Sequence, residues 1–124
     1  MGNFIITPNE LFARIGGPDA PIVLDVCKCD DYDSTPRLVP TARWRDHQQA
    51  AEWAHEIPRG QQVVTISVRG KKVSQAAAAE LRLKGIDAAA LEGGNEAWVK
   101  AGLPTVAKRL GIGLRPVGSP ERER

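Results

Sequence analysis

The feature that most constrains the fold is residues 63–83, where a short apolar run meets a loop and then an alanine-rich stretch. Residues 63–66, V-V-T-I, have the length and composition of a buried strand. A six-residue loop over 67–72 follows directly, and residues 73–83 are expected to form a helix. A strand that turns straight into a helix in this way favours an α/β fold.

The same alternation continues on both sides of this segment. Further strands are expected over 4–6, 22–26, 43–44 and 88–91, and further helices over 7–15, 48–56 and 95–100. Thr7, Pro8 and Glu10 give the first of these helices the pattern of a capped start. Short apolar strands separated by helices predict a mostly parallel central sheet with helices on both faces.

Composition limits the classes of function. A chain of 124 residues is the size of one domain, which we assign to residues 1–108, and the charged tail 109–124 is expected to end in disorder. A net charge of +2, from 17 basic and 15 acidic residues, is too balanced to indicate nucleic-acid binding. The sequence has no membrane-length apolar run or signal-peptide pattern, and its two cysteines cannot staple a fold, so we expect a cytoplasmic protein.

The loop over 67–72 has the features of an anion site. The first N–H groups of a helix lack intrahelical partners and carry the positive end of its dipole. Ser67 occupies the position at which a nucleophile would be activated, and we take it as the candidate catalytic position. The candidate substrate-binding residues are those that follow it, namely Val68, Arg69, Gly70, Lys71, Lys72 and Val73.

Four segments follow one another along the chain: V-L-D-V at 23–26, L-V-P-T-A-R at 38–43, the loop itself, and L-E-G-G-N-E-A-W at 91–98. In their residues and their order they resemble the motifs of rhodanese-like domains, and the resemblance runs from about Asn3 to Val106. Cys27 stands where the family usually has Arg, and Thr41 stands where it usually has Gly. The W-R-D at 44–46 and the V-S-Q at 73–75 resemble the rhodaneses associated with bacterial chromate resistance.

This resemblance implies the rhodanese-like fold and a sulfurtransferase activity. In the family a cysteine begins the loop, takes sulfane sulfur from thiosulfate or a persulfide, and passes it to a thiol or protein acceptor. A loop of six residues is typical of this sulfur chemistry, whereas dual-specificity phosphatases of the same fold have one residue more. The implied partner is a small sulfur-containing anion. No cofactor, metal, nucleic acid or membrane is expected.

Ser67 does not suit that mechanism, because a hydroxyl is a far weaker acid than a thiol of pKa about 8.5. A serine nucleophile needs a neighbouring base, and the histidines, His47 and His55, are expected on or near the helix over 48–56, well outside the loop. Three interpretations remain: an engineered Cys→Ser exchange, a natural change in a silent domain that binds anions or a partner protein, or sulfur transfer moved to Cys27 or Cys29.

The cysteines are expected at the same edge of the sheet as Ser67, because the carboxyl ends of parallel strands meet there. Cys27 is expected to pack in the core, and Asp30 and Asp31 are expected to raise the pKa of the Cys29 thiol, so neither should ionise readily. Other conspicuous residues are given structural roles. Asp25 is expected to form hydrogen bonds near this edge, Gly93 and Gly94 to form a tight turn, and Trp44, Trp53 and Trp98 to pack.

Overall fold

A central sheet of five parallel strands organises the molecule, which is described by a computed structural model over residues 4–27 and 37–107. The strands lie in the order β1 (Ile5–Ile6), β6 (Ala88–Leu91), β5 (Val63–Ile66), β2 (Ile22–Asp25) and β4 (Arg43–Trp44). The predicted parallel sheet is therefore confirmed, with β5 at its centre. Cys29 and the predicted tail 109–124 lie outside the described residues.

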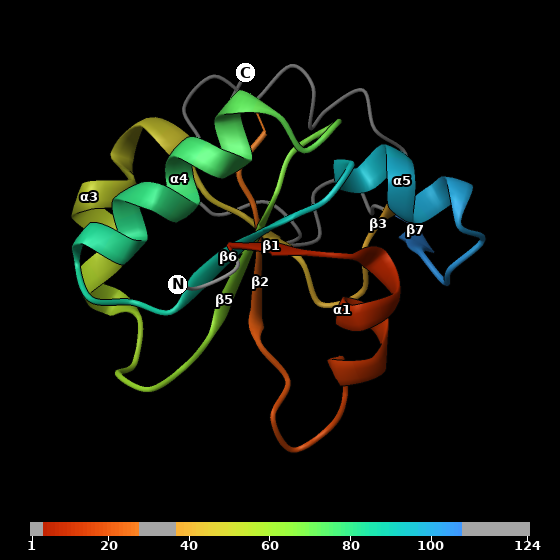
Figure 1. The fold of residues 1–124 in the computed structure, drawn as a ribbon, viewed down its shortest axis with the longest axis horizontal. Coiled ribbons are helices and arrows are strands. Elements are labelled where there is room, and N and C mark those ends of the chain that lie inside the picture. Colours follow the sequence, from red (N-terminus) through yellow and green to blue (C-terminus); the bar gives the residue numbers. More distant parts are fainter. Residues whose placement is uncertain (1–3, 28–36, 108–124) are drawn as a thin grey trace.

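Helices cover both faces of the sheet, as predicted (Figure 1). On one side lie α1 (Pro8–Arg14) and α5 (Gly94–Lys100), and on the other lie α3 (Ala50–Trp53) and α4 (Lys72–Leu83). Among the helices of the described residues, none is long and apolar enough to cross a membrane.

The first helix begins as its sequence predicts. The Thr7 side chain accepts a hydrogen bond from the backbone N–H of Glu10, and the Glu10 carboxylate accepts one from the backbone N–H of Thr7. This capping box satisfies two donors that a helix start otherwise leaves open. At the other end, the backbone leaves the helical conformation at Ile15.

The helix predicted over 48–56 is broken into shorter pieces. Only α3 is α-helical there, and 3₁₀ turns precede it as η1 (His47–Gln49) and follow it as η2 (Ala54–Glu56). Asp46 caps η1 by accepting from the backbone N–H of Gln48, while its own carbonyl accepts from the Trp53 indole. These local hydrogen bonds compete with a regular helix. A smaller correction concerns α4, which begins at Lys72 rather than Val73.

A second, two-stranded antiparallel sheet was not predicted. It pairs β3 (Arg37–Leu38) with β7 (Val106–Ala107), so the segment before β4 meets the segment after α5. Strands of two residues carry no usable periodicity in the sequence.

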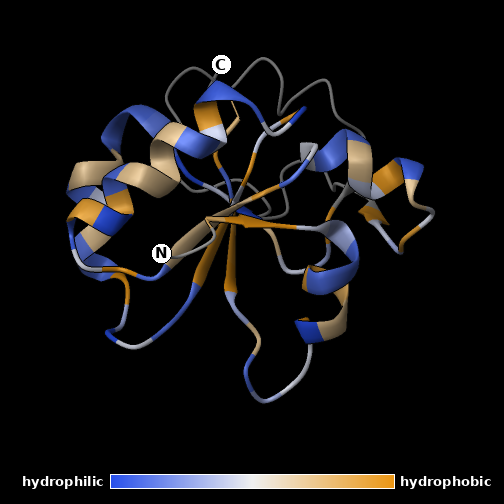
Figure 2. Cartoon of the chain, viewed as in Figure 1, coloured by the Kyte–Doolittle hydropathy of each residue, from blue (hydrophilic) through white to orange (hydrophobic). Residues whose placement is uncertain are grey.

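The core forms two layers, one on each face of the sheet, and Figure 2 shows the apolar residues gathered in the strands. The layer under α3 and α4 is rich in alanine, whereas the layer under α1 and α5 holds larger side chains, including Leu11, Leu91 and Trp98. The small residues allow α4 to pack closely on β5 and β6. The amino end of α4 lies close to the end of β5, since the Ser74 carbonyl accepts a hydrogen bond from the Thr65 hydroxyl.

The order in which the chain adds strands to the sheet reverses between β2 and β5, which is the topological switch point of the sheet. From β2 the chain continues to β4 on one side, and from β5 it continues through α4 to β6 on the other side. Neighbouring parallel strands that diverge in this way leave a crevice outside their carboxyl ends, which is where ligands bind in open α/β sheets. The candidate loop begins at this point, directly after β5.

Candidate functional site

Ser67 is the first residue after the central strand. It is 7 % exposed and follows Ile66, whose carbonyl accepts a hydrogen bond from the Val26 N–H across the switch point. Asp25 pairs with Ile66 in the register of β2 and β5, so Cys27 and Ser67 follow their strands at the same edge of the sheet. The predicted juxtaposition of these two positions is thus confirmed.

The Ser67 hydroxyl is held by two buried partners. Its Oγ accepts a hydrogen bond from the Gly70 N–H at 3.0 Å, and lies 3.0 Å from Oγ of Ser74 in the first turn of α4. An atom at this position is therefore surrounded by hydrogen-bonding groups of the loop and of the helix that follows. The same groups could stabilise a negative charge there, because hydrogen bonds to an ionised form favour it.

The loop rests on the first turn of α5, shortly after β6. The N–H of Asn95 donates to the carbonyl of Ser67 at 2.9 Å, and the N–H of Glu96 donates to the carbonyl of Val68 at 3.0 Å. The backbones approach so closely that a Cβ on Gly70 would lie 2.6 Å from the Leu91 carbonyl oxygen, and one on Gly94 would lie 2.3 Å from that of Ser67. Glycine at both positions is what permits the loop to close.

The cationic side chains of the loop lie at its outer surface. Arg69, Lys71 and Lys72 are exposed, and Nε of Arg69 lies 3.7 Å from a carboxylate oxygen of Glu96. Lys71 is the N-cap of α4 and provides no side-chain cap, in contrast to Thr7 at α1. The six candidate substrate-binding positions are therefore divided, with Gly70 buried, Val68 and Val73 half-buried, and the three cationic residues exposed.

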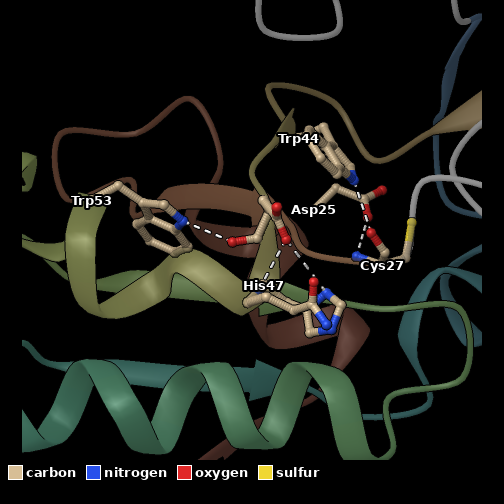
Figure 3. Close-up of polar contacts among 7 residues, drawn as sticks. Asp25, Cys27, Trp44, His47 and Trp53 are labelled. Carbon is tan, nitrogen blue, oxygen red and sulfur yellow. Dashed lines mark hydrogen bonds and ion pairs between the residues drawn. The ribbon is translucent and has the colours of Figure 1, made fainter. Parts of the chain in front are cut away.

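The backbone of Cys27 is held by hydrogen bonds to two side chains (Figure 3). Its N–H donates to Oδ1 of Asp25 at 3.1 Å, and its carbonyl accepts from the Trp44 indole at 2.8 Å. The residue is 4 % exposed, so the prediction that Cys27 packs in the core is confirmed. The expected structural hydrogen bonding of Asp25 is confirmed as well.

The two histidines lie in the 3₁₀ turns on either side of α3. His47 begins η1, three residues after β4, and therefore follows its strand at the same edge of the sheet as Cys27 (Figure 3). Among the residues that the structure describes, His47 Nδ1 has no hydrogen-bond partner, and the nearest carboxylate oxygen, Oδ1 of Asp46, lies 4.0 Å away. His55 lies in η2 and lines a surface cavity with Arg59 and Lys84.

The three tryptophans are packing residues, as predicted. All three are buried, and each indole N–H donates to a backbone carbonyl, at Cys27, Asp46 and Pro104 respectively. Buried Trp side chains usually find such a partner for the indole N–H.

Sequence reasoning did not identify Ser74 and Gln75 as parts of the site. Ser74 contacts the Ser67 hydroxyl, and the Gln75 side-chain amide donates to the Gly70 carbonyl at 2.8 Å. A signal was present, because the first turn of a helix after a short loop points polar side chains back toward that loop.

Comparisons with solved structures support the fold. A scan against protein-family models and a search of curated proteins found no match. Among solved structures, a rhodanese homologue from Thermus thermophilus is 30% identical, with a TM-score of 0.61 over 77% of this chain and 100% of its own. A rhodanese-related protein from Thermoplasma volcanium is 23% identical, with a TM-score of 0.73 over 86% of this chain and 100% of its own.

A third neighbour is much longer than this chain. It is a thiosulfate sulfurtransferase from Pseudomonas aeruginosa, 27% identical, with a TM-score of 0.72 over 90% of this chain but only 21% of its own. The fold and the identity to the Thermus homologue indicate the same family. The chain belongs to the rhodanese-like domain family.

Proposed function

We propose that this chain is a rhodanese-type sulfurtransferase scaffold whose loop 67–72 binds a small sulfur-containing anion, and that Ser67 leaves it unable to carry the sulfur. The observation that most supports this is the setting of Ser67. It is the first residue beyond the central strand, and the Gly70 N–H already donates to its side-chain oxygen. We assign the domain to residues 1–108. We also propose that the protein acts in the cytoplasm.

The chemistry requires a thiolate at position 67. Such a thiolate attacks the outer sulfur of thiosulfate, the S–S bond breaks, and sulfite leaves with the electron pair. The resulting persulfide then gives its terminal sulfur to cyanide, a thiol or a protein acceptor, and the thiolate is regenerated. The serine oxygen cannot form a stable analogue of the persulfide, and a serine hydroxyl does not ionise near neutral pH. The chain with Ser67 should therefore not turn over thiosulfate.

The test is the Ser67→Cys variant, treated with thiosulfate and analysed by mass spectrometry. We expect one sulfur atom to be added at position 67 and thiosulfate:cyanide activity to become measurable. The unmodified chain, which retains Cys27 and Cys29, is the matched control and should show neither. If the variant takes up no sulfane sulfur, the pocket is not a sulfurtransferase pocket.

A second candidate is a catalytically silent module that binds an anion or a partner protein. The engagement of the Ser67 hydroxyl by Gly70 and Ser74 favours it, because the loop is then closed without any reactive group. Isothermal titration of the unmodified chain with thiosulfate, sulfate and chromate would test this function. No binding at millimolar anion would contradict it.

The two ends of α4 provide matched lysines for that titration. Lys72 begins the helix at the loop, and Lys84 caps its far end, and both side chains are exposed. Lys72→Ala should weaken anion binding, whereas Lys84→Ala should leave it unchanged. Equal effects of both variants would indicate attraction by the overall charge rather than by the loop.

A further inference from the structure

The V-S-Q segment after the loop has a structural role that the proposed function leaves unexplained. Val73 packs against the core layer under α4, while the next two side chains reach back to the loop. Gln75 holds the Gly70 carbonyl, and Ser74 Oγ lies 3.0 Å from Ser67 Oγ. The segment therefore acts on the loop from its helical side.

The position of Ser74 leaves its hydroxyl little freedom. The residue is fully buried, and its carbonyl accepts a hydrogen bond from the Thr65 hydroxyl at 2.8 Å. A buried hydroxyl needs a hydrogen-bond partner, because leaving one unsatisfied costs free energy. The partner found for Ser74 Oγ is the side-chain atom at position 67.

We propose that Ser74 is the residue that stabilises an anionic sulfur at position 67, by donating its hydroxyl hydrogen to that sulfur alongside the Gly70 N–H. The inference rests on the proposed function, since it assigns a role within the same loop. Between two serine hydroxyls either oxygen can donate. A thiolate can only accept, so Ser74 becomes the donor when sulfur occupies the position. Donation to the ionised form lowers the pKa of the thiol.

The test measures the pH at which the thiol introduced by Ser67→Cys is half-ionised, from its rate of alkylation by iodoacetamide. Peptide mass spectrometry separates this thiol from Cys27 and Cys29. Adding Ser74→Ala should raise the midpoint by about one pH unit, a roughly tenfold loss of thiolate near neutral pH. Equal midpoints in the single and double variants would overturn the proposal.

Two further variants separate donation from packing. Thr65→Val removes a buried hydroxyl that contacts Ser74 but not position 67, and should leave the midpoint unchanged. Ser74→Thr keeps a hydroxyl on the same carbon and should retain the low midpoint. If Thr65→Val shifts the midpoint as far as Ser74→Ala does, general disturbance of α4 explains the effect and the proposal fails.

The outcomes also separate this inference from the function on which it rests. If Ser67→Cys forms no persulfide but its midpoint rises when Ser74 is replaced, the sulfurtransferase proposal falls and the role of Ser74 stands. If the persulfide forms and the midpoint does not depend on Ser74, the function stands and the role of Ser74 falls.

Discussion

Among the turns that place a residue in the left-handed conformation, those at Thr41 and Gly94 differ in whether a side chain fits. Thr41 has a φ of 71°, and Gly94 has a φ of 63°. A β-branched residue is rare in this conformation, and glycine adopts it without a steric penalty. The family pattern has glycine at both positions, yet this chain keeps only the second.

The turn at Thr41 requires a positive φ but leaves room for a side chain. The Ala42 N–H donates to the Val39 carbonyl at 3.1 Å, and Pro40 precedes the left-handed residue, which is the pattern of a type II turn. Thr41 is exposed, so its side chain extends into solvent. The substitution costs conformational strain but causes no clash.

The turn at Gly94 also requires a positive φ, and it leaves no room for a side chain. A Cβ there would lie 2.3 Å from the Ser67 carbonyl oxygen and 2.5 Å from the Gly70 nitrogen. These are backbone atoms of the candidate loop and cannot move aside without changing it. A family glycine can thus be replaced where only its backbone angle is used, and not where two backbones meet.

The largest effect should come from Gly94→Ala. Left-handed strain and a clash with the loop together should reduce the free energy of unfolding by about 2–5 kcal/mol, measured by urea denaturation. In the Ser67→Cys background, the same change should also abolish sulfur uptake, because the clash displaces the loop.

Gly102→Ala is the matched control, since Gly102 has a φ of 73° and no atom within 4 Å of the added Cβ. It should cost only about 1 kcal/mol and leave sulfur uptake intact. If the two glycine variants were equally destabilised, backbone strain alone would explain both. The claim that Gly94 is also needed for space would then be wrong.

Thr41→Gly should have a smaller effect of opposite sign. Removing the strained side chain stabilises the native state, while the extra freedom of glycine in the unfolded chain offsets part of that gain. We expect a net increase of up to about 1 kcal/mol in the free energy of unfolding, measured by urea denaturation. A decrease would mean that the Thr41 side chain contributes contacts that outweigh its strain.

The smallest effect concerns an exposed ion pair in the segment after the Thr41 turn. Arg45 donates to Glu56 at 3.1 Å, and this hydrogen bond and the Arg45 charge hold the pKa of Glu56 below its ordinary value. The pair therefore stabilises the native state above the unfolded-state pKa, and that contribution is lost as the pH falls through the lower folded-state pKa.

Thermal unfolding of Glu56→Gln and the unmodified chain at neutral and acidic pH measures that contribution. We expect a slightly lower Tm for the variant at neutral pH, and a difference that disappears in acid. A difference that persists below the folded-state pKa would have to come from packing rather than charge.

The strands of the five-stranded sheet were predictable from the sequence to within a residue, helped by four-residue apolar runs such as 63–66 and 88–91, which are buried on both faces. The start of α1 was predictable because its cap is local. The break in the helix over 48–56 was not, because it depends on Asp46 and Trp53 contacting each other across a turn. The pairing of β3 with β7 joins segments far apart in sequence and was not predictable either.

The position of the site was predictable from the sequence, but the side-chain contacts within it were not. Strand order and loop composition correctly placed Ser67 beside Cys27 at one edge of the sheet. Composition did not predict that the charge of Arg69 lies close to Glu96, or that Ser74 reaches the Ser67 hydroxyl. Those contacts depend on where α4 and α5 pack, which is a property of the tertiary structure.

The support of the loop by the segment after β6 also has a consequence for synthesis on the ribosome. The carbonyls of Ser67 and Val68 emerge well before Asn95 and Glu96, whose N–H groups are their partners. Until those residues emerge, the two carbonyls lack the partners that hold them in the folded chain. The nascent chain therefore carries the complete loop sequence for some time before it has the loop's shape, and the β6–α5 unit, which is translated after the loop, completes the site.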